Sequence, residues 1–139
     1  MKALIIEDTE HDFVIVSDVL SSLKHKSTSA SSVASAIKKL NDEEYDMIFL
    51  DLNLLDSSGL ETIEEIKEAK QSSVLNLYTP IIVLTGMDDF STTKKALKAG
   101  ARDYLVKGEF GIEDIERAIR YATISHLNPK RNWVKRLFS

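Results

Sequence analysis

Four short runs of apolar residues in this chain each lead into polar side chains at which the run ends. The runs cover residues 3–8, 47–51, 81–85 and 103–107, and they end in Glu7-Asp8, Asp51, Thr85 and Lys107. Near-continuous Val, Ile and Leu are typical of strands covered on both faces, as in parallel sheets. If the runs are neighbouring parallel strands, three acids, a hydroxyl and an ammonium meet at one edge of the sheet. We therefore expect a site for a divalent cation and a phosphoryl group at that edge.

Stretches with the apolar spacing of helices separate these runs. We expect strands at 2–7, 26–30, 46–51, 80–85 and 103–106, and helices at 10–24, 32–41, 59–71, 90–99 and 112–126. The alternation of strands and helices predicts an α/β fold, a doubly wound parallel sheet between two helical layers. Five strands suit the flavodoxin-like order 2-1-3-4-5, which places a ligand site at the carboxyl ends of the first and third strands.

Composition and charge exclude several kinds of site and partner. The chain has no cysteine, so disulfides and thiolate metal sites are excluded. The formal net charge of −4 gives the whole molecule no bias toward nucleic acid, and we expect no direct nucleic-acid partner. No apolar stretch is long enough to span a bilayer, and the first apolar run is too short for a signal peptide. We expect a soluble, cytoplasmic protein.

The acids at the ends of the first and third expected strands form a candidate metal site. Mg²⁺ or Mn²⁺ takes one or two carboxylates and a phosphate oxygen as natural ligands. Asp8 and Asp51 are candidates for direct ligands, and the longer Glu7 is expected to act through water. In the alternative interpretation, Asp8 or Thr9 caps the following helix. That alternative does not account for Asp51, because no helix is expected to begin within several residues of it.

Taken together, these residues resemble the receiver domain of two-component response regulators, over roughly residues 2 to 126. The resemblance is carried by Glu7-Asp8, Asp51, Thr85, Tyr104, Lys107 and the spacing of Gly59 from Asp51. It implies that Asp51 accepts a phosphoryl group from a sensor histidine kinase or a histidine phosphotransfer protein. It also implies that Asp8, Asp51 and the backbone carbonyl of Asn53 hold the metal ion.

The resemblance implies roles for three further residues. Lys107 would bind a phosphoryl oxygen, and Thr85 would donate a hydrogen bond once the phosphoryl group is present. Tyr104 would then turn inward and change the face formed by the fourth helix, the fifth strand and the fifth helix. Ordinary alternatives are a turn residue for Thr85, a solvated lysine for Lys107 and a core residue for Tyr104.

Three positions depart from the family pattern. Leu55 stands where proline is usual four residues after the acceptor, and Glu7 replaces an aspartate. Gly108 follows Lys107 where the family has a proline after a cis peptide bond. A cis bond without proline costs about 3 kcal/mol. The Lys107–Gly108 bond is therefore either cis and strained, or trans in a loop that runs differently.

Residues 127–139, the tail, are expected to follow the receiver domain (residues 1–126) as a short basic amphipathic segment. Asn128-Pro129 is typical of a helix start. In such a helix the apolar residues Trp133, Val134, Leu137 and Phe138 would share a face, and the basic residues Lys130, Arg131, Lys135 and Arg136 would flank it. The tail could contact a partner or an anionic membrane. In the alternative it is frayed, or packs on the acidic domain.

The connection at residues 72–79 is rich in apolar side chains, namely Val74, Leu75, Leu77 and Tyr78. We expect these side chains to pack beneath the connection. The alternative is a contact surface for a second chain.

Three functions remain open at this point. The first is a stand-alone response regulator or phosphorelay shuttle that switches the binding of an unknown downstream protein and is not an enzyme beyond slow self-dephosphorylation. The second is a phosphatase with an aspartyl-phosphate intermediate, which is opposed by Asn53 where such enzymes carry a second aspartate. The third is a pseudo-receiver used only for protein contact.

Overall fold

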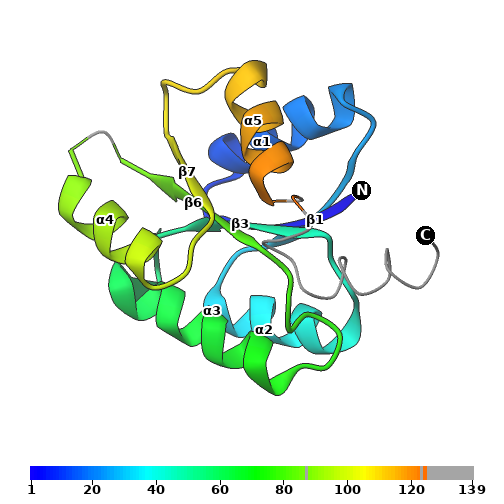
Figure 1. Cartoon of the computed structure of the whole chain (residues 1–139), viewed down its shortest axis with the longest axis vertical. Coiled ribbons are helices and arrows are strands. Elements are labelled where there is room, and N and C mark those ends of the chain that lie inside the picture. The colour runs from blue at the N-terminus through cyan, green and yellow to red at the C-terminus, as the bar shows by residue number, and fades with distance from the viewer. Residues whose placement is uncertain (87, 123, 125–139) are drawn as a thin grey trace.

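The computed structural model describes residues 1–86, 88–122 and 124, and this part of the chain contains a five-stranded parallel sheet. Its strands are β1 (Lys2–Ile6), β2 (Lys26–Ala30), β3 (Met47–Asp51), β6 (Ile81–Thr85) and β7 (Asp103–Val106). They are ordered β2-β1-β3-β6-β7, and Figure 1 shows β1, β3, β6 and β7 in this order. Because β6 and β7 are the fourth and fifth strands of this sheet, the predicted order 2-1-3-4-5 is confirmed.

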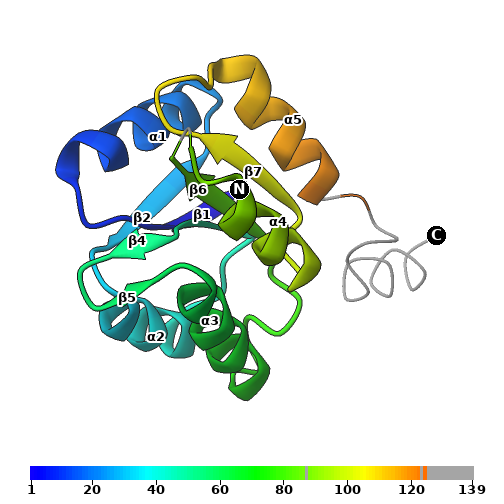
Figure 2. The same ribbon diagram turned by 90° about the vertical axis from the view of Figure 1, so that its left-hand side faces the viewer.

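Helices cover both faces of the sheet (Figure 2). One layer consists of α1 (Glu10–Ser22) and α5 (Ile112–Ala122), and the other of α2 (Val33–Asp42), α3 (Leu60–Ser72) and α4 (Phe90–Lys98). The predicted positions agree to within two residues, and the part of the predicted helix 112–126 beyond Ala122 lies mostly outside the described residues, as does the tail. Of the described helices, none combines the length and apolar character that a membrane span requires.

The register of the strands places the polar residues at one edge. Ile6 pairs with Leu50 and Asp51 with Leu84, so the residues after β1 lie beside the end of β3. The side chains of β3 and β6 are buried throughout, as expected for central strands covered on both faces. The edge strand β2 is only partly buried, which explains its polar sequence.

A small hairpin follows β3 and was not predicted. It consists of β4 (Asn53–Leu54) and β5 (Ser57–Ser58), which pair antiparallel. Leu55 at its tip is 92% exposed, so the hairpin does not need proline at this position for packing. Gly59 then has φ +60°, a left-handed conformation that favours glycine, and its N–H donates to the carbonyl of Leu52 at 2.6 Å. These features connect β3 to α3 in a compact turn.

The connection between α3 and β6 has the reverse of the predicted burial. Val74 is 93% exposed, and Leu75, Leu77 and Tyr78 are also exposed, so the prediction that they pack beneath the connection was wrong. The buried side chains are polar and belong to Ser73, Asn76 and Thr79. They take the inner positions because they satisfy backbone groups of the neighbouring connection between α2 and β3.

Asn76 supplies most of these bonds. Its Nδ2 donates to the carbonyls of Leu40 at 2.6 Å and Glu43 at 2.7 Å, and its Oδ1 accepts the N–H of Tyr45 at 2.8 Å. The Thr79 hydroxyl donates to the carbonyl of Tyr45 at 3.0 Å. The two connections at this edge of the sheet are thus held together by buried hydrogen bonds.

We expect Asn76→Ala to lower the free energy of unfolding by roughly 2–4 kcal/mol, because each buried group left without a partner costs about 1–3 kcal/mol. Urea unfolding followed by circular dichroism measures this loss. The control Asn41→Ala removes an exposed asparagine from α2. Equal stability of the two variants would contradict the structural role of Asn76.

Candidate functional site

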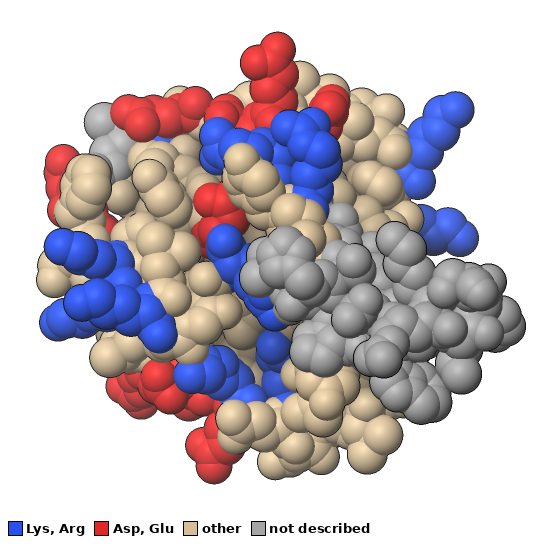
Figure 3. All heavy atoms as spheres, in the orientation of Figure 1, with Lys and Arg blue, Asp and Glu red and all other residues tan. Residues whose placement is uncertain are grey.

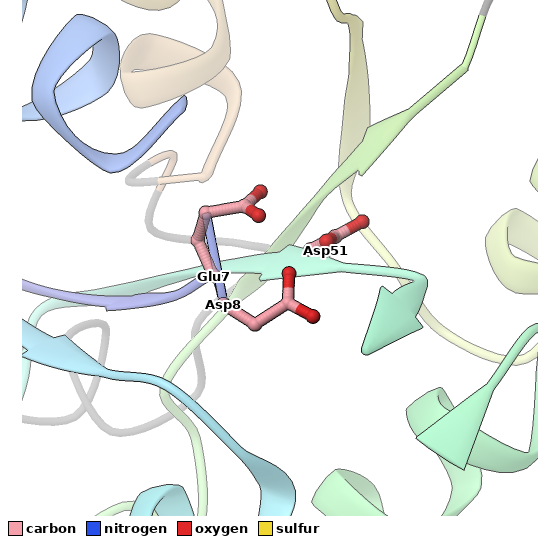
Figure 4. Close-up of side chains that lie close together, drawn as sticks. All are labelled: Glu7, Asp8 and Asp51. Atoms are coloured by element: carbon pink, nitrogen blue, oxygen red, sulfur yellow. The ribbon is translucent and has the colours of Figure 1, made fainter. Parts of the chain in front are cut away.

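The carboxyl ends of β1 and β3 bring three acids together. Glu7 and Asp8 follow β1, and Asp51 is the last residue of β3. One carboxylate oxygen from each lies within 4.8 Å of the other two. Figure 4 shows the three side chains at the same edge of the sheet. Glu7 is 2% and Asp51 3% exposed, whereas Asp8 is half-buried and closes the cluster toward solvent.

Lys107 lies among these acids. Its Nζ is 2.9 Å from Glu7 Oε2, 3.2 Å from Asp51 Oδ2 and 3.3 Å from Asp12 Oδ2. The alternative of a solvated lysine is therefore wrong. The sequence analysis missed Asp12, which lies in the first turn of α1, four residues after Asp8. No local signal indicated this role, because Asp8 precedes the helix and the partner of Asp12 is Lys107 from the loop after β7.

The loop after β7 holds Lys107 without a cis peptide bond. The described residues contain no cis peptide bonds, so the bond between Lys107 and Gly108 is trans and the second of the two predicted alternatives holds. Gly108 has φ +84°, and the N–H of Lys107 donates to the carbonyl of Thr85 at 2.8 Å. A left-handed glycine takes the place of the usual proline and still directs Lys107 into the site.

Burial and charge change the acidity of two groups in the site. Burial raises the pKa of Glu7 to about 7, although the hydrogen bonds from Lys107 and from the N–H of Thr9 act in the opposite direction. Burial alone would lower the pKa of Lys107, but its hydrogen bond to Glu7 and the charge of Asp51 raise it above the ordinary value. Lys107 therefore remains an ammonium at any physiological pH.

The acidic cluster fits a divalent cation. Glu7 Oε2 is buried, and its partner at 2.9 Å is the ammonium of Lys107. Asp51 Oδ1 accepts the N–H of Asn53 at 3.0 Å, which orients the carboxylate. Several carboxylate oxygens in one place are the ligands that Mg²⁺ prefers, and a divalent ion offsets their repulsion. The participation of the Asn53 carbonyl stays a prediction.

The alternative in which Asp8 or Thr9 caps the following helix holds in part. The N-cap of α1 is Thr9, and its side chain makes no capping hydrogen bond. The Thr9 N–H instead donates to Glu7 Oε1 at 3.1 Å. The acidic pair is therefore arranged around the cluster, and Asp8 is not the N-cap.

Thr85 at the end of β6 is bonded to a residue that the sequence analysis missed. The hydroxyls of Thr85 and Thr93 are 2.8 Å apart, and that of Thr93 is also 2.7 Å from the carbonyl of Asp89. A carbonyl only accepts and Thr93 has one hydroxyl proton, so both bonds form together only when Thr85 donates to Thr93. Thr93 lies in α4, eight residues after Thr85, and no local signal indicated it.

Tyr104 lies at the rim of a groove of about 420 Å³. The groove is lined by residues of β6, α4 and β7, among them Thr85, Phe90, Thr93, Leu97 and Tyr104. Tyr104 is 39% exposed, so it is not an ordinary core residue. The groove is thus lined both by Tyr104 and by the Thr85–Thr93 pair.

The comparison with known families decides what kind of domain this is. Residues 3–120 match the response regulator receiver domain. The chain belongs to this family. Receiver domains act in two-component signal transduction and partner with histidine kinases.

One relative, the sensory transduction protein LytR of Staphylococcus haemolyticus, is 38% identical over 90 residues, which are 65% of this chain and 32% of LytR. The transcriptional regulatory protein BasR of Escherichia coli is 31% identical over 132 residues, 92% of this chain and 54% of BasR.

Solved receiver domains have the same fold. A receiver domain protein from Clostridium thermocellum is 26% identical with a TM-score of 0.73, and the match covers 87% of this chain and 92% of that one. The receiver domain of the sensor histidine kinase PA1611 of Pseudomonas aeruginosa, with a magnesium ion in its active site cleft, has 24% identity and a TM-score of 0.73 over 87% and 95% of the chains. That second likeness shows the fold alone. This receiver domain spans about a third of LytR and half of BasR.

We expect Glu7→Gln to change how stability depends on pH in metal-free buffer. The pKa of Glu7 is about 7 in the folded protein against an ordinary value of 4.5. The stability that its protonated form contributes is complete below pH 4.5 and is lost as pH rises through 7. Relative to the variant, the wild type should lose up to about 3 kcal/mol across this window. Urea unfolding with EDTA at several pH values measures it, and parallel curves would contradict it.

Proposed function

We propose that this receiver domain accepts a phosphoryl group on Asp51 from a phosphohistidine of a sensor histidine kinase or a phosphotransfer protein. The observation that carries the proposal is the position of the Asp51 carboxylate, which is 3.2 Å from the ammonium of Lys107 and beside Glu7 and Asp8. A carboxylate oxygen of Asp51 would attack phosphorus as the P–N bond breaks. The electron pair of that bond leaves with the imidazole, which takes up a proton.

Each neighbouring group has a role in this reaction. Lys107, as an ammonium, would neutralise a phosphoryl oxygen. Mg²⁺ or Mn²⁺, held by Asp8, Asp51 and the Asn53 carbonyl with Glu7 bound through water, would supply charge neutralisation to the other oxygens. The magnesium ion in the receiver domain of PA1611 supports this assignment. The N–H of Asn53 holds Asp51 Oδ1 in place at 3.0 Å.

The output is a change of protein contacts on the face formed by α4, β7 and α5. To bind a phosphoryl oxygen, the Thr85 hydroxyl would leave Thr93, and the Tyr104 side chain would enter the groove beside them. Basic side chains gather over α4 in Figure 3, where its sequence contains Lys94, Lys95 and Lys98. A downstream protein that binds this face would contact the lysines of α4 next to Tyr104.

We propose a switch or phosphorelay shuttle and not an enzyme with turnover. Asn53 stands where aspartyl-phosphate phosphatases carry a second acid, and it contributes its N–H to Asp51. The phosphoryl group would leave only by slow hydrolysis or by transfer to another protein. Since LytR and BasR are much longer than this chain, the stand-alone role stays a prediction.

We expect Asp51→Asn to abolish phosphoryl labelling by acetyl phosphate or a histidine kinase, because the amide is not a nucleophile. Labelling of the wild type should require Mg²⁺ and stop in EDTA. Acid-stable, base-labile radioactivity on the denatured protein measures it. The control Asp88→Asn changes an exposed acid outside the cluster and should label normally. Undiminished labelling of the Asp51 variant would refute the proposal.

We expect Thr93→Val to strengthen the binding of beryllium fluoride, a phosphoryl mimic, by about fivefold. In the wild type, Thr85 must break its hydrogen bond to Thr93, worth about 1 kcal/mol, before it binds the mimic, and in the variant this bond is absent. Calorimetric titration with Mg²⁺ present measures the affinity. Thr92→Val makes the same chemical change one position earlier and serves as the control. Affinity that is unchanged or weaker in the Thr93 variant would show that the Thr85–Thr93 bond does not oppose the switch.

A further inference from the structure

The connection between α3 and β6 carries an exposed apolar surface at the edge of the sheet opposite the functional site. It consists of Val74, Leu75, Leu77 and Tyr78, which we call the apolar loop surface, with exposed fractions from 39% to 93%. Apolar side chains clustered in this way are typical of contact sites.

Buried hydrogen bonds hold these side chains outward. Asn76 bonds to both Leu40 and Glu43, the Ser73 hydroxyl donates to the carbonyl of Leu40 at 2.9 Å, and Thr79 bonds to Tyr45. For the apolar side chains to turn inward, these polar groups would have to lose their partners, which is costly inside a protein. The outward direction of the apolar loop surface is therefore built into the fold.

Acidic residues border the surface on one side. The same hydrogen bonds tie the loop to residues 42–46, a segment that contains four acids: Asp42, Glu43, Glu44 and Asp46. All four are exposed. On the other side, α3 carries Lys67 and Lys70 in its last turns. A basic apolar segment would therefore dock with its charges toward residues 42–46.

The tail of the same chain has the matching chemistry and begins near this surface. Because α5 follows β7 and runs back along the sheet, it ends at the edge where the chain enters β6, the strand next to β7 (Figure 1). Residues 123–127 can span up to about 17 Å, which is roughly three strand spacings. The tail beyond them has four bases, no acid and four large apolar residues.

We propose that residues 128–138 dock on the apolar loop surface of their own chain, with Trp133, Val134, Leu137 and Phe138 against it and the bases toward residues 42–46. A helix of this length is marginal in water and needs such a surface to form. A second copy of the loop fits less well, because residues 42–46 of the two copies would repel each other. The same acids would oppose the approach of this edge to an anionic membrane.

The experiment uses the fluorescence of Trp133, the only tryptophan in the chain. In the full-length protein, Trp133 should emit at shorter wavelength and be quenched less by acrylamide than in a peptide of residues 123–139. The double variant Val74→Asp with Leu77→Asp should remove this difference, and Glu44→Lys should reduce it in a salt-dependent way. Leu55→Asp, at the exposed hairpin tip at the opposite edge, is the matched control and should change nothing. Circular dichroism verifies that each variant is folded.

Four outcomes would overturn the proposal. Quenching equal to that of the free peptide means that the tail is undocked, and protection unaffected by the loop variants means that it docks elsewhere. Protection that grows with protein concentration points to a second copy, and protection only with anionic vesicles points to a membrane. None of these readouts depends on phosphorylation of Asp51, so the proposed function is tested separately.

Discussion

The functional edge depends on the pairing of one ammonium with buried carboxylates. Lys107 lies within 3.3 Å of acids from three other parts of the chain, Glu7, Asp12 and Asp51. Two of these acids are almost fully buried, and a buried charge without a partner strongly opposes folding. The ion pairs therefore join β1, α1, β3 and the loop after β7 at the point where those elements meet. The stability of the fold and the proposed function rest on the same contacts.

The compensation of charge in the site is incomplete, and this incompleteness is chemically useful. Burial raises the pKa of Glu7 to about 7, so the ammonium of Lys107 does not fully offset the burial of this carboxylate. A divalent ion would complete the neutralisation, and a phosphoryl group would then find cations on more than one side. In the proposed function, binding of the metal ion, acceptance of the phosphoryl group and relief of electrostatic repulsion would be one process.

Polar side chains have different roles at the two edges of the sheet. At the carboxyl edge, charged side chains converge around the buried carboxylate of Asp51. At the amino edge, Asn76 and its neighbours use neutral hydrogen bonds to fix two connections, and this fixes apolar side chains in solvent. Helix α5 ends at the amino edge, so a segment docked there would lie next to the end of a helix of the face that we propose to switch.

The sequence by itself determined the strand order, the helix positions to within about two residues and the set of acids, hydroxyl and lysine at the strand ends. These follow from local apolar patterns and from the rule that parallel strands align their carboxyl ends. Only the tertiary structure decided that Asp12 joins Lys107, that Thr85 bonds to Thr93 and that Val74 and its neighbours face outward. Each of these depends on side chains from distant segments that compete for the same partners, and periodicity along the chain carries no information about that competition.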